Sequence, residues 1–194
     1  MDFSLNDDFE TIKKQFLAKA GRMYAASRGE YLNGKIMAKY LGFEFIDSAN
    51  VIRFDKDGHF DADTTDKLLS ERLAAYDHAV IPGFYGAMAN GTVVTFSRGG
   101  SDITGSLVAK AIHADLYENW TDVSGVLVAD PRIINNPEVI HTITYTELRE
   151  LAYMGASVLH EDAIFPVRKA GIPINIRNTN APAVSYTHLT LPTT

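Results

Sequence analysis

Apolar residues recur at helical and strand spacings along most of this chain of 194 residues. Positions three or four apart predict helices over 7–26, 31–40, 64–75, 145–154 and 162–170, and one that includes 107–112. Short apolar or β-branched runs predict strands at 43–46, 51–54, 79–81, 93–96, 115–120 and 172–176. Because helices alternate with strands, some of them uniformly apolar, we expect an α/β fold: a three-layer αβα sandwich with a mostly parallel sheet.

Polar and glycine-containing segments separate these elements. Asp7 or Asp8 is placed to cap the first helix, and 27–30 is expected to break the pattern, which puts Glu30 in the first turn of the second helix. Asn90-Gly91 predicts a hairpin turn. The segment 82–86 follows a buried strand, so we expect a loop there that lines a pocket at the sheet edge.

Composition narrows the possible classes of protein. With 46% hydrophobic residues, the chain can bury a core large enough for one α/β domain, which we place at 1–183. The net charge of -6 argues against nucleic acid or an anionic membrane as a partner. No cysteine is present, which excludes disulfides and thiolate metal sites. The acidic start and the lack of a long apolar run favour a cytoplasmic protein.

The segment 93–106 holds the strongest candidate site. A β-branched run ends in Arg98-Gly99-Gly100-Ser101-Asp102, and helical spacing follows. Glycines let backbone amides approach a ligand, a helix N-terminus favours an anion, and the Arg98 guanidinium suits a carboxylate or a phosphate. Ser101 or Asp102 is placed to cap the helix.

Three polar groups, around Glu30, Arg98 to Asp102 and Thr121 to Arg132, fall where strands or helices meet loops, so we expect them to share one cleft. The six histidines show no spacing typical of a metal site, and neither a Gly-x-Ser-x-Gly elbow nor a Walker loop is present. These residues alone indicate an anion-binding α/β enzyme.

Several motifs occur together in one order. They are Ser27-Arg28-Gly29-Glu30, Pro82-Gly83-Phe84-Tyr85-Gly86, Arg98-Gly99-Gly100-Ser101-Asp102, Trp120-Thr121-Asp122-Val123-Ser124-Gly125-Val126, Ala129-Asp130-Pro131-Arg132, Gly155-Ala156-Ser157-Val158-Leu159-His160 and Ala170-Gly171-Ile172-Pro173. In this combination, 7–182 resembles the catalytic domain of aspartate kinases, in the amino acid kinase family. The resemblance implies transfer of the ATP γ-phosphoryl group to the side-chain carboxylate of L-aspartate, which gives 4-phospho-L-aspartate, the first step of lysine, threonine and methionine biosynthesis.

The resemblance also implies residue roles. Arg98 would hold an aspartate carboxylate, Glu30 its ammonium group, and Ser101 would assist placement, while Asp102 would orient a catalytic lysine. Nucleotide contacts would come from Gly99, Gly100, Thr121, Asp122, Leu127, Arg132, Ser157 and Val158. Mg²⁺ would be held through the phosphates of ATP and water rather than by a set of protein ligands. A homo-oligomer is expected for the full-length parent.

The sequence departs from the family pattern in places. The Lys-Phe-Gly-Gly loop after a first strand has no counterpart here, so the chain is interpreted as lacking that strand and negligible turnover is expected from it alone. In the aspartate kinase pattern, Tyr is frequent at the position of Leu127, and Lys is frequent at the position of Ser157. A non-native or disordered tail is expected over 184–194. The alternatives are a non-catalytic subunit that binds aspartate and nucleotide, or another amino acid kinase such as acetylglutamate or uridylate kinase.

Overall fold

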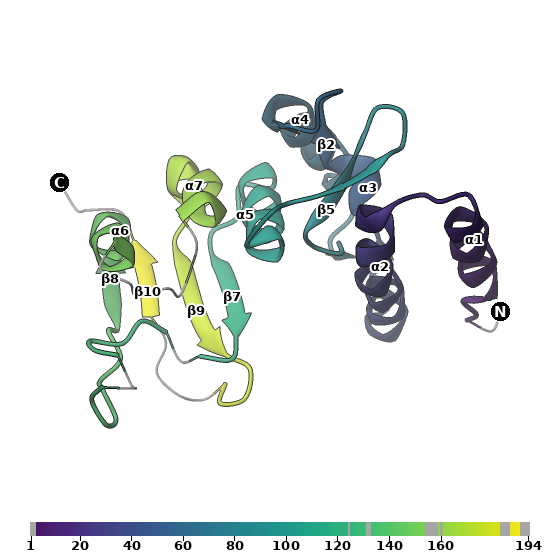
Figure 1. Cartoon of the computed structure of the whole chain (residues 1–194). Helices are drawn as coiled ribbons and strands as arrows, with labels where there is room; N and C mark the ends of the chain where they lie inside the picture. The colour runs from purple at the N-terminus through teal and green to yellow at the C-terminus, as the bar shows by residue number, and fades with distance from the viewer. Residues whose placement is uncertain are drawn as a thin grey trace. The chain divides into compact units, whose positions relative to one another are not determined.

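The structure is a computed structural model that describes residues 3–123, 125–130, 133–153, 159, 161–182 and 187–190. Helices and strands alternate along the chain, which confirms the expected α/β class (Figure 1). The chain divides into two compact units, Met1–Thr104 and Gly105–Thr194. Helix α5 (Gly100–Ala111) has residues in both units. The single domain predicted over 1–183 stays a prediction.

The first unit carries four helices before α5 among its described residues and two small sheets. Its helices are α1 (Asn6–Leu17), α2 (Arg22–Leu41), α3 (Ser48–Val51) and α4 (Ala62–Leu73). Its strands are β1 (Glu44–Phe45), β2 (Arg53–Phe54), β3 (Phe60–Asp61), β4 (Ala79–Val80), β5 (Tyr85–Met88) and β6 (Val93–Thr95).

Both pairing directions occur in the first unit. Strands β1 and β4 pair in parallel, and the second sheet has the order β3-β2-β5-β6 with β2 and β5 parallel. The hairpin predicted at Asn90-Gly91 joins antiparallel β5 and β6, and Gly91 takes the left-handed φ of 85° that such a turn requires. Strand β5 begins at Tyr85, so the pocket-lining loop predicted over 82–86 is shorter than expected.

The first two helices meet at a different place from the one predicted. Helix α1 ends at Leu17, and the chain reverses through Lys19 at φ 58° and Gly21 at φ 93°. Helix α2 then continues without a break through 27–30, so Glu30 lies in its interior and the first-turn placement is wrong. Asp7 and Asp8 lie in the first turn of α1 rather than at its N-cap.

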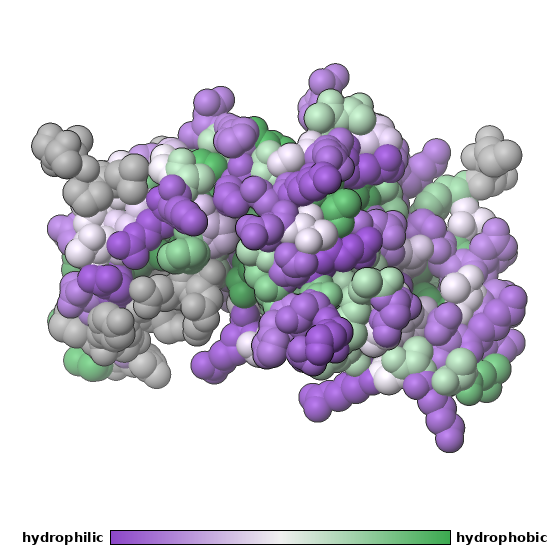
Figure 2. Space-filling view, turned by 90° about the horizontal axis from the view of Figure 1, so that it is seen from above, coloured by the Kyte–Doolittle hydropathy of each residue, from purple (hydrophilic) through white to green (hydrophobic). Residues whose placement is uncertain are grey.

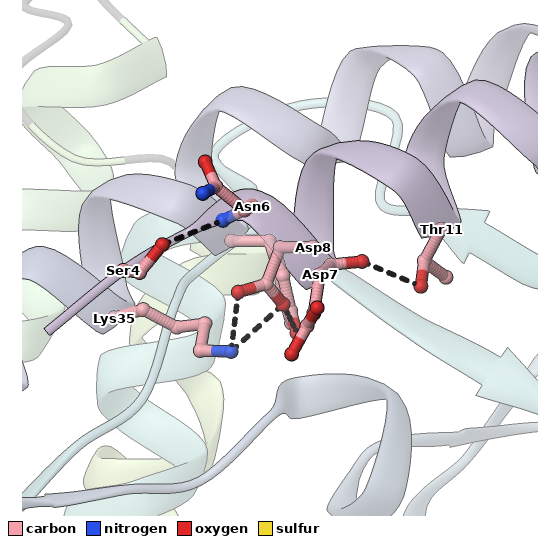
Figure 3. A network of polar contacts seen from close by, with 7 residues as sticks. Ser4, Asn6, Asp7, Asp8, Thr11 and Lys35 are labelled. Atoms are coloured by element: carbon pink, nitrogen blue, oxygen red, sulfur yellow. Dashed lines mark hydrogen bonds and ion pairs between the residues drawn. The ribbon is translucent and has the colours of Figure 1, made fainter. Parts of the chain in front are cut away.

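A polar network holds α1 against α2 (Figure 3). Both carboxylate oxygens of Asp8 lie 2.7 Å from Lys35 Nζ, and the Tyr31 hydroxyl donates to Asp8 Oδ1 at 2.8 Å. Burial alone would raise the pKa of Asp8, but the hydrogen bonds from Lys35 and Tyr31 outweigh it and lower this pKa. Ile12 is the buried residue of α1, so this ion pair is a major part of its attachment.

The second unit contains one mixed sheet and helices whose side chains share a buried cluster with it. Its strands β7 (Tyr117–Thr121), β9 (Ile174–Asn178), β10 (Thr187–Thr190) and β8 (Thr142–Thr144) lie side by side in that order (Figure 1). Helices α6 (Tyr145–Tyr153) and α7 (Glu161–Ala170) contribute Leu148, Ile164 and Val167 to a buried cluster with Ile174 and Ile176. This cluster is the core of the unit.

Strand β10 differs from the disorder expected over 184–194. Residues 187–190 pair in parallel with β8 and antiparallel with β9. Thr187 and Leu189 are fully buried while His188 and Thr190 are half-buried, which is the alternation of a strand with one face on a core. The period of two over four residues is too short to stand out in the sequence.

The exterior is mixed in polarity. On the face shown in Figure 2, hydrophobic side chains lie in small areas between hydrophilic ones. Within the described part of the chain, no helix has the length and apolar character needed to cross a membrane.

Candidate functional site

The loop between β6 and α5 holds the predicted anion-binding residues. Gly99 takes a left-handed φ of 57° and its carbonyl accepts the N–H of Ile103 at 2.9 Å, which starts α5. Arg98 and Ser101 are exposed and Asp102 is half-buried. The helix begins at Gly100, so Ser101 and Asp102 lie within its first turn rather than at the predicted cap. Arg98 makes no hydrogen bond or ion pair with another described residue, so its guanidinium is open to a ligand.

A second loop packs tightly against this helix start. A Cβ on Gly100 would lie 2.6 Å from the Cβ of Phe84, and a Cβ on Gly83 would lie 3.0 Å from the Cα of Ser101. The side chain of Thr104 accepts the Phe84 N–H at 3.1 Å and donates to the Gly100 carbonyl at 2.8 Å. The two loops therefore form one rigid wall that presents Arg98 and Ser101.

Phe84 is held in an unusual conformation within this wall. Its φ of 62° is left-handed, which is strained for a bulky residue. Besides the bond to Thr104, its carbonyl accepts the Phe96 N–H at 2.9 Å. Sequence reasoning missed both Phe84 and Thr104, because their role depends on packing between segments twenty residues apart. The motif 82–86 was the signal for Phe84, and Thr104 lies within the candidate segment 93–106.

Glu30 reaches the same wall from α2. It is half-buried and makes no hydrogen bond with a described residue. Gly34, one turn later on the same helical face, comes within 3.4 Å of the Pro82 Cβ when given a Cβ. The face of α2 that carries Glu30 thus lies beside the 82–84 loop, and that loop contacts Ser101. Glu30, Arg98 and Ser101 all belong to the first unit.

Apart from Gly99 and Gly100, the nucleotide residues predicted from the sequence fall in the second unit. Thr121 ends β7, and its carbonyl accepts both the backbone N–H and the hydroxyl of Thr179, at 2.8 and 2.9 Å. Its hydroxyl lies 3.3 Å from Asp122 Oδ1, and the Asp122 side chain is exposed. Strands β7 and β9 are parallel, so these groups lie at their carboxyl ends, where ligands of α/β sheets bind.

Leu127 lies in a short hairpin after this strand. It forms an isolated bridge to Val139, and the flanking bonds join Val128 to Glu138 and Ile140 to Val126. Its side chain is half-buried, which leaves part of it accessible. The other predicted nucleotide residues, Arg132, Ser157 and Val158, lie outside the described residues.

A stacked cluster next to Thr121 escaped sequence reasoning. The guanidinium of Arg177 lies 4.6 Å from the ring centre of Trp120, and its Nη1 is 2.9 Å from Glu118 Oε1. The indole N–H of Trp120 donates to Glu118 Oε2 at 3.1 Å. The Arg177 bond is the main reason that the pKa of Glu118 is lowered. Trp120 is the single tryptophan of the chain and is 43% exposed, so it can report on this corner.

One group of possible metal ligands occurs among the described residues. It comprises Asp55, Asp57 and His59, all exposed in the turn between β2 and β3. The Asp55 carboxylate already accepts backbone N–H groups of Asp57 and His59. These hydrogen bonds account for the cluster as turn chemistry.

Comparison with known proteins identifies the family to which the chain belongs. Residues 3–178 match the amino acid kinase family. Aspartokinase 3 of Bacillus subtilis (strain 168) is 50% identical over 119 residues, 61% of this chain and 26% of that protein. The crystal structure of Clostridium acetobutylicum aspartate kinase has a TM-score of 0.92 and 57% identity, over 98% of this chain and 44% of that chain. The crystal structure of Escherichia coli aspartokinase III in complex with lysine and aspartate has a TM-score of 0.80 and 26% identity, and the match covers 97% of this chain and 47% of that chain.

The fold and these matches define the class of protein: the chain belongs to the amino acid kinase family. Within that family, these three relatives are aspartokinases. The chain spans less than half the length of each of them. The expected family and the expected fold class are both confirmed.

Proposed function

We propose that this chain is part of an aspartate kinase catalytic domain, which phosphorylates the side-chain carboxylate of L-aspartate with ATP. The observation that carries the proposal is the wall in the first unit, where Gly83 and Gly100 allow two loops to pack closely and present Arg98, which has no partner among the described residues. A guanidinium beside a helix N-terminus suits a small carboxylate ligand. The aspartate bound to the Escherichia coli relative agrees with this chemistry.

Each first-unit residue then has a role in binding aspartate. Arg98 pairs with a carboxylate of the substrate, and Glu30, which lacks a partner among the described residues, pairs with its ammonium group. Ser101 donates a hydrogen bond from the first turn of α5. Asp102 orients the catalytic lysine that the family supplies. A cation and an anion used in this way match the carboxylate and the ammonium group of an amino-acid substrate.

Most of the proposed nucleotide residues belong to the second unit. Among the described residues of the second unit, Thr121 and Asp122 contact the adenosine part and Leu127 contacts the base. The family resemblance also assigns the base to Ser157 and Val158, and the phosphates to Arg132 and, in the first unit, to the Gly99-Gly100 backbone. Mg²⁺, when bound, would be held through the phosphate oxygens of ATP and water rather than by a set of protein ligands, and it would neutralise phosphate charge. The Asp55 cluster belongs to a separate turn and takes no part.

The reaction requires placement more than proton transfer. The aspartate carboxylate is ionised near neutral pH, so one of its oxygens attacks the γ-phosphorus without a general base. The bond from that phosphorus to the β–γ bridging oxygen breaks, and ADP leaves with the electron pair. Catalysis therefore comes from positioning and charge neutralisation. Since the relatives reported above are aspartokinases, neither the non-catalytic subunit nor another amino acid kinase is favoured. Homo-oligomer formation stays a prediction.

Calorimetric titration of the whole chain with L-aspartate tests the first-unit roles. We expect Arg98→Ala to weaken binding about 10- to 100-fold, because a charge-assisted pair is lost. Lys13→Ala is the matched control, since Lys13 is a cation on the exposed face of α1, and it should leave the affinity unchanged. A chain that binds no aspartate, or an Arg98→Ala chain with unaltered affinity, would refute the assignment.

Tryptophan fluorescence tests the second-unit roles separately. Adding Mg-ADP should change the emission of Trp120, because Thr121 and Asp122 follow it directly in the chain. Asp122→Asn should raise the nucleotide concentration needed for half of this change about tenfold, through loss of a charge-assisted hydrogen bond. An emission that does not respond to nucleotide contradicts the placement.

A further inference from the structure

Arg28 is a buried cation that the proposed reaction does not use. It lies in α2 with only 9% of its surface exposed. Its Nε and Nη2 donate to the neighbouring Ser27 Oγ at 3.1 and 2.9 Å, and it forms no ion pair with a described carboxylate. Burial of a charge without a counterion is unfavourable, so other groups must stabilise this one.

Three aromatic rings surround the guanidinium. Its carbon lies 4.5 Å from the ring centre of Tyr24, 4.6 Å from Tyr31 and 5.4 Å from Tyr85, which we call the tyrosine cage. The electron-rich faces of such rings attract a cation, most strongly where water is excluded. The cage thus stabilises the guanidinium in place of a carboxylate.

Two carboxylates strengthen the cage indirectly, through the hydroxyls of its tyrosines. The hydroxyl of Tyr31 donates to Asp8 and that of Tyr85 donates to Asp47, both at 2.8 Å. Burial and these nearby carboxylates raise the pKa of both tyrosines, so their hydroxyls remain protonated donors. Each bond shifts negative charge toward the ring that faces Arg28. The cage therefore links α2 to α1, through Asp8, and to the N-cap of α3, through Asp47.

The cage also connects the two parts of the proposed aspartate pocket. Glu30 follows Arg28 by two residues on the same rigid helix. Tyr85 directly follows Phe84, and their rings meet edge to face at 5.9 Å. Rotation of α2 about its axis would move Glu30, and it would also pull Arg28 out of contact with Tyr85.

We propose that Arg28 is a positioning residue, whose packing in the tyrosine cage fixes α2 against β5 and so holds Glu30 beside the 82–84 loop. The consequence for aspartate rests on the proposed function, whereas the fixation is a property of the chain without ligand. Arg28→Met keeps much of the side-chain length and removes the charge and the planar donors. Lys35→Met, two turns later on the same face, breaks the Asp8 ion pair and leaves the Tyr85 contact.

Hydrogen exchange on the whole ligand-free chain is the first test. In Arg28→Met, the amides of Phe84 and Phe96 should exchange about tenfold faster, because their bonds join the 82–84 loop to its neighbours. In Lys35→Met, the amides of α1 should exchange faster, whereas the exchange rates of the Phe84 and Phe96 amides should not change. Acceleration of all first-unit amides alike, or none at Phe84 and Phe96, would overturn the proposal.

Ligand affinity is the second test. Arg28→Met should weaken L-aspartate binding about tenfold and leave Mg-ADP binding within about twofold, while Arg28→Lys should recover part of the loss by restoring the cation. Equal weakening of both ligands would indicate a general structural role and overturn the proposal. If the unaltered chain binds no aspartate while exchange changes as expected, the proposed function fails and the positioning role stands.

Discussion

At the scale of single residues, close contact at Gly100 gives a sharp prediction. Gly100→Ala should lower the free energy of unfolding of the first unit by about 1–3 kcal/mol, because the new methyl would overlap Phe84. Gly29→Ala is the matched control in α2, where nothing lies within 4 Å, and it should raise stability by about 0.5–1 kcal/mol. Urea unfolding followed by circular dichroism measures both. Equal effects at the two glycines would contradict the packing described.

Arg177 gives a second prediction at this scale. Its bond is the largest cause of the lowered pKa of Glu118, so Arg177→Met should raise that pKa toward its usual value of 4.5. Because Glu118 also accepts the indole N–H of Trp120, tryptophan emission should follow this titration. The midpoint of emission against pH should lie below 4.5 in the unaltered chain and higher in the variant. An unchanged midpoint would count against the Arg177 pair.

At the scale of elements, the attachment of α1 should depend on pH. The pKa of Asp8 is lowered by folding, so its stabilising contribution is complete above the unfolded value near 3.8 and is lost as the pH falls through the lower folded value. The protection of the α1 amides, corrected for the pH dependence of intrinsic exchange, should therefore fall below pH 3.8 as Asp8 becomes protonated. Lys35→Met should show fast exchange at neutral pH already, and a pH response as large as that of the unaltered chain would refute this attachment.

The elements also show what the sequence could reveal. Local signals worked: Asn90-Gly91 predicted the hairpin, and the change of spacing after 98–102 predicted the start of α5. Where an element depends on distant contacts, the prediction failed. Ser27, Arg28 and Gly29 resemble a break, yet α2 runs through them, and Arg28 is buried there against Tyr85 of β5. Gly86 was predicted to lie in a loop and lies in strand β5. It packs so closely against Ile52 that a Cβ at this position would lie 2.5 Å from the Ile52 carbonyl oxygen.

For the candidate site too, the sequence revealed local motifs and did not reveal contacts between distant segments. Arg98 and the two glycines could be found from one short motif, and so could Thr121 and Asp122. Phe84, Thr104 and Arg28 could not, because each acts through packing against residues far along the chain. Periodicity shows which residues are buried and carries no information about which buried polar group supports a ligand.

At the scale of the whole molecule, α5 contributes to both compact units. Thr104 bonds to Phe84 in the first unit, while Ser106 Oγ accepts the Val167 N–H in the second. Gly105→Ala should destabilise the second unit by about 1–3 kcal/mol, because a Cβ there would lie 2.5 Å from the Tyr117 hydroxyl. Trp120 emission during urea unfolding should report this loss and should change less for Gly100→Ala. Identical emission curves for both variants would refute the assignment of the two glycines to different units.

The left-handed Phe84 has a consequence for engineering. A bulky residue in that region costs about 1–3 kcal/mol, which a glycine would recover. Phe84→Gly would relieve that strain but would also remove the ring contact with Tyr85 and the close packing on Gly100, so the loop would no longer hold the start of α5 in one place. The strained backbone at this position is therefore maintained by the contacts of the side chain that it carries.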